Sequence, residues 1–299
     1  MIVNDERLDC LIAGDANVDL IVNGAPDVEY NAEKLAQGME LTLGGSSSIT
    51  AYNLARLGVT TGFLGVVGSD LFGDFIVNSL ISANVNVDAL HRDVREKTGL
   101  TIWLSQAVRR AGITYPGTIA SLCAAHFKRE HLQRARHLHV GHYFLLTKLH
   151  PDAAAVFRQA KGLGMTTSLD CNYDPANKWK SHIEDVLRYT DVFFPNEEEA
   201  RRLTGTNSTE AAAIQLANLA RTVAVKRGAD GILVCSSGSC FHLAAPAVDV
   251  VDTTGAGDSF NAGYLSRFLQ GADARACAEA GLTAAARCIS RVGGTTAFE

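Results

Sequence analysis

Short apolar runs alternate along this chain with segments whose apolar residues recur at helical spacing. The runs are rich in β-branched residues and nearly continuous, as in strands that are covered on both faces of a sheet. They occupy residues 8–22, 60–68, 137–146, 165–172, 191–196, 222–228 and 231–238. Helical spacing is found at residues 48–57, 152–163, 197–203 and 209–221. This order predicts an α/β fold built on a mostly parallel sheet.

Two segments break the alternation, one near residues 20–42 and one near residues 95–117. The second contains TGLTIWLSQAVRRAGITYPG, which predicts a β-hairpin that turns at Arg110 to Gly112. We expect the two segments to form a small sheet over one edge of the core, either as a lid or as a plain extension of that edge. Residues 1–299 then make one domain with this sheet inserted in it.

The composition is that of an ordinary globular protein, with 299 residues, 47% of them hydrophobic and 20% charged. The 27 Lys and Arg against 32 Asp and Glu give a net charge of -5 without a basic stripe, so no nucleic-acid partner is expected. The N-terminus lacks the pattern of a signal peptide, and no stretch is apolar for the length of a membrane span. We therefore expect a cytoplasmic protein with no membrane partner.

Cysteine and histidine offer no clear metal site. The seven cysteines include no Cys-x-x-Cys pair, which argues against a disulfide framework and against a zinc site. They are Cys10, Cys123, Cys171, Cys235, Cys240, Cys277 and Cys288. His137, His139 and His142 lie close together, but nothing nearby completes a ligand set. We expect polar tips at a strand end there.

The stretch VVDTTGAGDSFNAGYL, residues 250–265, carries the clearest chemistry. An apolar run ends in a glycine-rich loop, and a helix pattern follows. Gly255, Ala256 and Gly257 would let the first amides of that helix approach an anion closely, because these amides have no partner within the helix. Helical spacing of Phe260, Tyr264, Leu265, Phe268 and Leu269 supports a helix that begins there. The loop therefore predicts an anion cradle at the edge of the sheet.

Asp258 follows this cradle directly. A carboxylate would repel a bound phosphate unless it had a chemical task, and phosphoryl transfer provides one: a base that orients the attacking hydroxyl group and accepts its proton. A P-loop is absent, since no GxxxxGK[ST] occurs in the sequence. His91-Arg92-Asp93 matches the start of the protein-kinase catalytic loop, but Thr98 stands where that loop needs Asn. We take that match as chance.

The residues that surround these motifs resemble the ribokinase-like, or PfkB, family of carbohydrate kinases. DTTGAGDSFNAGYL matches the C-terminal signature of that family, and GGSSSITAYNLARLGVTTGFLGVVGSDLFG matches its N-terminal signature. PNEEEA at residues 195–200 and VKRGADG at residues 225–231 match two further family segments. The resemblance covers nearly the whole chain, and two signatures in the right order make it specific.

This resemblance implies an ATP-dependent kinase with a three-layer α/β/α core and a small β-sheet lid. Asp258 would be the catalytic base, and Gly255, Ala256 and Gly257 would form the anion hole. The matched nucleotide-binding positions are Asn196, Glu199, Lys226, Gly228 and Gly231. Glu199 would hold Mg2+ through water. Many family members also use a monovalent cation such as K+, for which the candidates are Asp252, Thr254, Arg291 and Gly293.

The acceptor side follows from the same resemblance. The matched substrate-binding positions are Asn17, Asp19, Gly44, Gly45, Ser46, Asp170 and Asn172. In the predicted lid, Trp103 would share a strand face with Thr101 and would either stack on a sugar or a base or belong to the core of the lid. A carboxylate such as that of Asp19 can accept hydrogen bonds from two neighbouring sugar hydroxyl groups. Ile49 stands where the signature usually has Asn, which makes ribose itself less expected. Tyr173 stands where Arg is common, which makes a 2-keto-3-deoxygluconate kinase less expected, because that substrate carries a carboxylate.

Several substrates and roles stay open on the sequence. The first is a sugar, of the ribokinase or fructokinase type. A nucleoside becomes the better choice if Trp103 and Tyr115 stack on a base. A phosphosugar would need cations, and Lys97, Arg109 and Arg110 are near the predicted lid. A non-catalytic sensor of nucleotide or sugar is disfavoured by the intact loop. Exposed lid edges would also allow a homodimer through that sheet.

Overall fold

A large sheet runs through the centre of the computed structural model, which describes residues 7–24, 27–106 and 109–299. Its strand order is β14-β13-β12-β11-β10-β9-β1-β4, and all neighbours are parallel except β12-β13 and β13-β14. The strands are β1 (Leu8–Ala13), β4 (Thr61–Leu64), β9 (Ala135–Val140), β10 (Thr166–Leu169), β11 (Val192–Phe193), β12 (Thr222–Lys226), β13 (Ile232–Ser236) and β14 (Ser239–Leu243). The predicted α/β class is confirmed.

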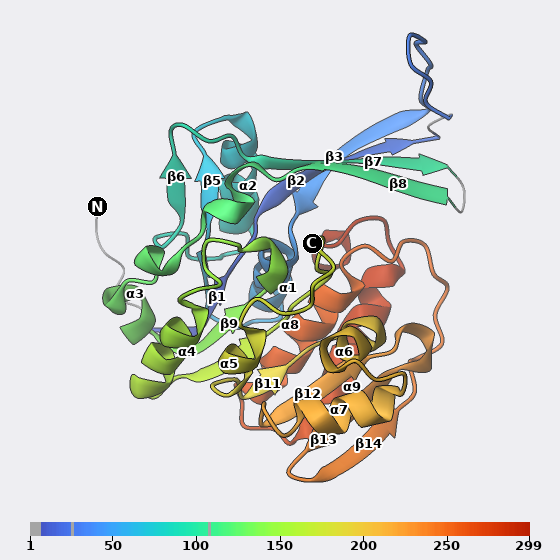
Figure 1. Cartoon of the computed structure of the whole chain (residues 1–299). Coiled ribbons are helices and arrows are strands. Elements are labelled where there is room, and N and C mark those ends of the chain that lie inside the picture. Colours follow the sequence, from blue (N-terminus) through green and yellow to red (C-terminus); the bar gives the residue numbers. More distant parts are fainter. Residues whose placement is uncertain (1–6, 25–26, 107–108) are drawn as a thin grey trace.

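Helices cover both faces of this sheet and give three layers (Figure 1). One face packs on α1 (Ser46–Arg56), α2 (Leu71–Ser82), α8 (Ala256–Phe268) and α9 (Ala274–Ile289). The other packs on α3 (Arg129–Gln133), α4 (Ala153–Gly162), α5 (Ile183–Leu187), α6 (Glu197–Thr204) and α7 (Thr209–Leu216). Successive strand residues serve opposite cores: Leu11 lies in one and Ile12 in the other. This explains the nearly continuous apolar runs.

The remaining elements are short. A two-stranded sheet joins β5 (Val66–Gly68) and β6 (His91–Asp93). The 3-10 helices are η1 (Gly117–Ser121), η2 (Ala124–His126), η3 (Tyr143–Leu145), η4 (Gly228–Asp230) and η5 (Thr296–Phe298). Within the described residues, no helix has the length and apolar character needed to cross a membrane.

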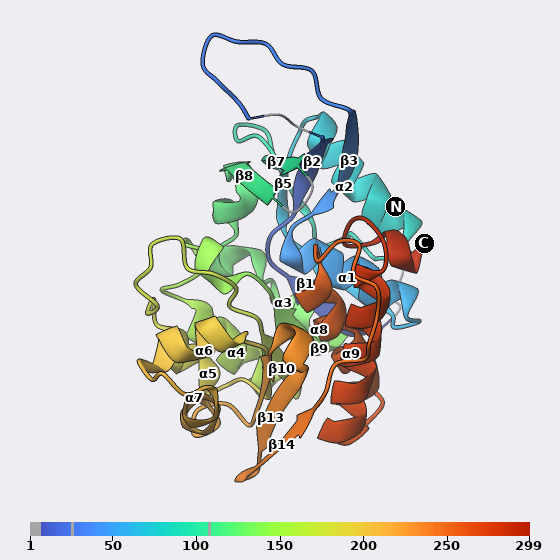
Figure 2. The ribbon, with the colours of Figure 1, turned by 90° about the vertical axis from the view of Figure 1, so that its right-hand side faces the viewer.

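A second sheet, the lid sheet, projects from the core over the carboxyl ends of its strands (Figures 1 and 2). It has the order β3-β2-β7-β8 and consists of β2 (Asn17–Asn23), β3 (Gly38–Gly44), β7 (Gly99–Gln106) and β8 (Arg109–Tyr115). The apolar run at residues 8–22 therefore divides between the two sheets. Gly14, with φ of 151°, lies at the break. The two segments that broke the sequence pattern contribute these strands, with β2 beginning slightly earlier.

The predicted hairpin turn was placed too late in the chain. Arg110 to Gly112 lie within β8, paired with Ser105, Leu104 and Trp103. The connection between the strands falls at residues 107–108, outside the described residues. A Cβ atom at Gly112 would come within 2.6 Å of the ring of Trp103, the residue that it faces on β7. The glycine therefore leaves room for the indole of Trp103 and does not mark the turn of the hairpin.

One pair of cysteines departs from the expectation that the cysteines stay unpaired. Cys235 and Cys240 form a disulfide between directly opposed residues of β13 and β14. Their Cα atoms are 4.1 Å apart. Only the hairpin register brings them together, so no spacing rule for metal sites or disulfide frameworks would find them. The other five cysteines are free.

Candidate active site

The glycine loop forms the N-terminus of α8, as the sequence predicts. Gly255 precedes the helix in the left-handed region, with φ of 72°. The backbone amides of Gly257 and Asp258, in the first turn, have no acceptor among the described residues. A Cβ atom at Gly257 would lie 3.4 Å from Lys226 Nζ. Free amides and an ammonium group therefore converge at one place, which suits the charge of a phosphate group.

Asp258 lies on this first turn and is partly buried. Its Oδ1 accepts a hydrogen bond from the hydroxyl group of Ser46, at the start of α1. Burial raises the pKa of Asp258 to about 7; the Ser46 bond and Lys226 work in the opposite direction, and the charge of Asp170 adds to the rise. A carboxyl group with a pKa near neutrality is well suited to accept a proton from an alcohol. Ser46 shows that a hydroxyl group can reach it.

Lys226, the last residue of β12, forms an ion pair with Asp170, which follows β10. Its Nζ lies 2.6 Å from Asp170 Oδ2, and Asn261 Nδ2 donates to the same oxygen at 2.5 Å. Asp170 is fully buried. Burial alone would lower the pKa of Lys226, but Asp170 and Glu199 raise it, so the group stays an ammonium ion. The sequence predicts that Asp170 contacts the sugar; in the structure its Oδ2 is bonded to Lys226 and Asn261.

Asn196 and Glu199 form a capping box at the start of α6. Asn196 Oδ1 accepts from Glu199 N at 2.9 Å, and Glu199 Oε2 accepts from Asn196 N at 2.8 Å. Burial, followed by the charge of Asp170, raises the pKa of Glu199 to about 7. Asp170, Cys171 and Glu199 offer ligand atoms within 4.8 Å of one another. Carboxylate oxygens are the ligands that Mg2+ prefers. The carboxyl groups of Asp170 and Glu199 therefore fit a hydrated Mg2+ bound nearby.

The polar residues of the lid sheet lie on one face. Asn17 Nδ2 donates to Asp19 Oδ1 at 3.0 Å and to Thr101 Oγ1 at 3.2 Å, and all three residues are buried. A Cβ atom at Gly44 would lie 2.5 Å from the Asp19 carboxyl carbon, so glycine is required there. Gly45 precedes α1 with φ of 91° and leads directly into Ser46. These predicted acceptor residues are thereby brought together.

Trp103 and Tyr115, the two aromatic residues considered for stacking on a base, lie on opposite faces of the lid sheet. In the register of β2, β7 and β8, Asp19 pairs with Thr101, and Trp103 pairs with Gly112, whereas Tyr115 pairs with Leu100. Since residues alternate between faces, Trp103 shares the face of Thr101 and Tyr115 lies on the other. They cannot stack together on one base.

The remaining predicted positions are more scattered. Asn172 has a left-handed backbone, with φ of 51°, just after β10. Gly228 and Gly231 enclose η4, and a Cβ atom at Gly231 would lie 2.0 Å from Leu243 O. Ile49 is buried and packs against the backbone of Gly255 and Gly294. A Cβ atom built on Gly255 would lie 3.3 Å from the Ile49 side chain.

The candidate residues for a monovalent cation link two loops. Asp252 Oδ1 accepts from Thr254 Oγ1 at 2.7 Å, and Asp252 Oδ2 accepts from Gly293 N at 2.9 Å. This connects the loop before α8 to the loop after α9. Arg291 is exposed. Thr254, Gly293 and Asp252 therefore lie together.

Residues 7–299 match the pfkB family carbohydrate kinases. The chain belongs to this family. The carbohydrate kinase is accordingly a phosphotransferase that uses an alcohol group as acceptor. It is 31% identical over 285 residues to 2-dehydro-3-deoxygluconokinase of Bacillus subtilis, an alignment that covers 89% of this chain and 84% of the relative.

Solved structures share its ribokinase-like fold. Ribokinase of Arabidopsis thaliana, complexed with ribose and ATP, has a TM-score of 0.84 at 23% identity, covering 97% of this chain and 95% of the other. A protein of E. coli assigned to ribokinase II, in complex with ATP and Mg2+, has a TM-score of 0.85 at 23% identity, covering 98% and 96%. At this identity the likeness establishes the fold.

The sequence did not identify one pair of charged residues in the kinase. Asp15, just after β1, is 1% exposed and lies 2.8 Å from His142 Nδ1, just after β9. The only signal was their position after two apolar strands. His137 and His139 instead lie within β9, where their rings are hydrogen-bonded to Thr166 and Ser168 of β10. Both rings are fully buried, and this burial lowers their pKa.

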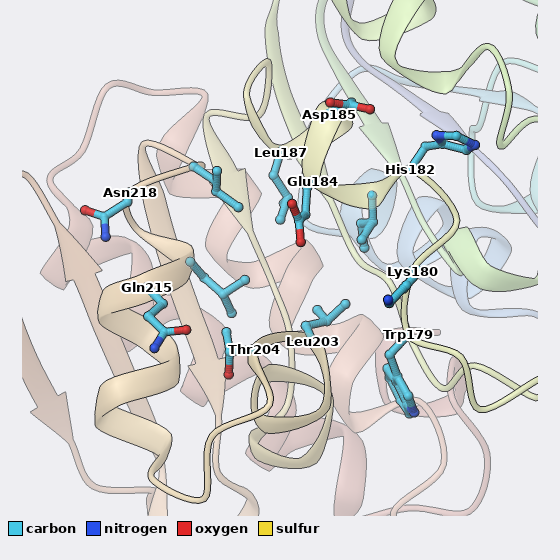
Figure 3. Close-up of a pocket in the computed structure, with 13 residues that line it drawn as sticks. Trp179, Lys180, His182, Glu184, Asp185, Leu187, Leu203, Thr204, Gln215 and Asn218 are labelled. Carbon is cyan, nitrogen blue, oxygen red and sulfur yellow. The ribbon is translucent and has the colours of Figure 1, made fainter.

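A separate hollow of about 560 Å³ lies between α5, α6 and α7 of the kinase (Figure 3). Trp179 and Lys180 border it at one end, and Gln215 and Asn218 at the other. None of the predicted site residues lines it. The predicted catalytic residues lie elsewhere, at the N-terminus of α8.

Proposed function

We propose that this kinase transfers the γ-phosphoryl group of ATP, bound with Mg2+, to a hydroxyl group of a small sugar. The observation that carries the proposal is the position of Asp258. It lies beside the free amides of α8 and accepts a hydrogen bond from the hydroxyl group of Ser46, which follows β3, the neighbour of the strand that carries Asn17 and Asp19. The relatives solved with ATP and Mg2+, and with ribose and ATP, support the choice of donor and acceptor.

The proposed reaction is a direct in-line transfer. Asp258 accepts the proton of the acceptor hydroxyl group as the new O–P bond forms and the bond to ADP breaks. The amides of Gly257 and Asp258, with Lys226, stabilise the charge on the moving phosphoryl group. Glu199 would hold Mg2+ through water, and the bound ion would supply further positive charge. The lid sheet excludes water and so limits hydrolysis of ATP.

Two further assignments belong to this proposal. K+ bound near Asp252, Thr254 and Gly293 would order the loop that precedes the anion hole. Asn17, Asp19 and Thr101 would bind sugar hydroxyl groups. A nucleoside acceptor is less well supported, because Trp103 and Tyr115 lie on opposite faces of the lid sheet. A non-catalytic sensor would have no need of a base with a pKa near neutrality.

The test is ATP consumption by the purified protein with Mg2+ and K+ across sugars, sugar acids, nucleosides and sugar phosphates. We expect turnover with one class, and in Asp258→Asn a loss of about 100- to 10,000-fold in kcat with ATP affinity retained by calorimetry. Near-normal turnover in that variant would remove Asp258 as the base. ATP binding without turnover on the whole panel would argue for the sensor instead.

A further inference from the structure

Asp15 lies just after β1, whose end is paired with the end of β9. Its carboxylate accepts four hydrogen bonds: from Ser46 N at 3.1 Å, Ser47 N at 2.9 Å, Ser47 Oγ at 2.7 Å and His142 Nδ1 at 2.8 Å. A Cβ atom at Gly14 would overlap Ser47 Oγ, so glycine lets α1 approach the strand end this closely. Asp15 is therefore fully occupied and positions two groups, the start of α1 and the His142 ring.

His142 is held in one orientation by this contact. Its backbone is left-handed, with φ of 52°, a conformation that costs free energy and is found where surrounding contacts enforce it. Nδ1 is bound to Asp15, and the side chain is 22% exposed. Nε2 has no partner in the part of the chain that the structure describes. The free ring nitrogen is thus open to a ligand.

The charges around His142 favour its protonated form. Burial would lower the pKa of the ring, but Asp15 at the end of β1, Asp258 on α8 and Asp170 at the end of β10 raise it above its usual value. Asp15 stays ionised, since the His142 charge and the hydrogen bonds outweigh the effect of burial and lower its pKa. A protonated ring with Nδ1 bound to Asp15 presents Nε2 as a hydrogen-bond donor.

We propose that His142 determines specificity by donating from Nε2 to a carboxylate of the acceptor, which would make the substrate a sugar acid. The inference rests on the proposed function and assigns it a substrate class. Lys226 is paired with Asp170 and faces Gly257, where it is assigned to the phosphoryl group, so His142 is left to present a cationic N–H to the acceptor. Tyr173 supplies no charge. A phosphate dianion is less well matched, because it usually requires several cationic donors.

The test compares acceptors that differ in the carboxylate. Gluconate and 2-keto-3-deoxygluconate are set against sorbitol and fructose for the wild type, His142→Gln and the exposed control His182→Gln. Glutamine keeps a neutral donor near the Nε2 position and removes the charge. We expect the wild type to prefer an acid, and His142→Gln to lose about 10- to 100-fold in kcat/KM for that acid through KM, with little change for neutral acceptors. His182→Gln should match the wild type.

The pH profile adds a readout that a purely structural role would not move. The KM for the acid should increase as the pH rises through the pKa of His142 in the wild type and should lose this dependence in His142→Gln. A preference for neutral sugars, with both acceptor types equally impaired in His142→Gln, would overturn the inference and leave the kinase proposal intact. A preference for sugar phosphates that depends on His142 would overturn the carboxylate assignment.

Direct binding separates this inference from the proposed function. Calorimetry on the same proteins measures acid binding without turnover. Binding that depends on His142 in an enzyme that consumes no ATP would support the inference and contradict the kinase proposal. Equal binding of acid and neutral analogue by the wild type would contradict the inference whatever the turnover.

Discussion

Asp170, Glu199 and Asp258 share the ammonium group of Lys226, which leaves their site with more carboxyl groups than cations. At the scale of single residues, burial raises the pKa of Asp258 and that of Glu199 to about 7, and the charge of Asp170 adds to both shifts. Burial penalises each charge, and only the ion pair between Lys226 and Asp170 is close. A Mg2+ ion bound near Glu199 would add positive charge to this group of carboxyl groups.

The first prediction at this scale concerns pH. Burial raises the pKa of Asp258 to about 7, and a base acts only when it is deprotonated. We expect kcat/KM for a neutral acceptor to increase as the pH rises through about 7, and to level off above it. Initial rates across that range, at saturating ATP, measure the profile. A flat profile would show that Asp258 does not titrate as the base.

The second prediction concerns Lys226. Its loss leaves Asp170 buried beside Glu199 without a counterion, and breaking such a buried pair costs about 3 kcal/mol or more. Lys226→Met should therefore lower the free energy of unfolding, measured by denaturant titration, and Asp170→Asn in the same chain should restore part of it. The control is Lys161→Met, because the pair of Lys161 with Asp191 is more exposed and should cost about 1 kcal/mol or less. Equal losses would contradict the prediction.

At the scale of elements, both ends of α8 are glycines in the left-handed region, Gly255 with φ of 72° and Gly271 with φ of 81°. Their surroundings differ. A Cβ atom at Gly255 would lie 2.6 Å from the Cα atom of Gly294, whereas nothing lies within 4 Å of one at Gly271. The first glycine therefore fixes the position of the anion hole, and the second only ends the helix.

This difference gives a matched pair of variants. Gly255→Ala should displace the loop from Gly294, reduce kcat by at least about 10-fold and destabilise the fold by more than about 1 kcal/mol. Gly271→Ala should cost only the free energy of placing alanine in a left-handed backbone conformation, and it should keep wild-type kcat. Steady-state kinetics and thermal melting of both variants check this. If the two behaved alike, the contact with Gly294 would have no role.

At the scale of the whole molecule, the lid sheet has two different faces. The face of Asp19 and Thr101 is polar, and the opposite face is apolar. The apolar face includes the exposed side chains Met39 and Ile113, at 67% and 70% exposure, on the outer strands β3 and β8. An uncovered apolar sheet face with free edges is typically buried against a partner.

We expect this face to join two copies of the chain. Light scattering coupled to size exclusion should give a dimer for the wild type, and Ile113→Lys should shift it toward a monomer, since a charge is costly in an apolar interface. Ile214→Lys is the control, because Ile214 is 54% exposed on α7, away from the lid sheet. A monomeric wild type at all concentrations would contradict the expectation.

The sequence alone predicted the parts of this protein that depend on local pattern. Apolar runs and helical spacing predicted the α/β class, and the glycine loop at Gly255 to Gly257 predicted where α8 begins. Such features are encoded within one segment, because helix starts, anion cradles and buried strands have short-range physical requirements.

Only the tertiary structure decided which distant residues meet. The pairing of Lys226 with Asp170, of Asp15 with His142 and of Cys235 with Cys240 depends on strand order and register. The same register places Trp103 and Tyr115 on opposite faces and puts the hairpin turn earlier in the chain than the sequence pattern predicted. A sequence fixes which faces are apolar, but the neighbour of a charged residue at a strand end is set by which strands lie side by side, and that is decided by packing of the whole chain.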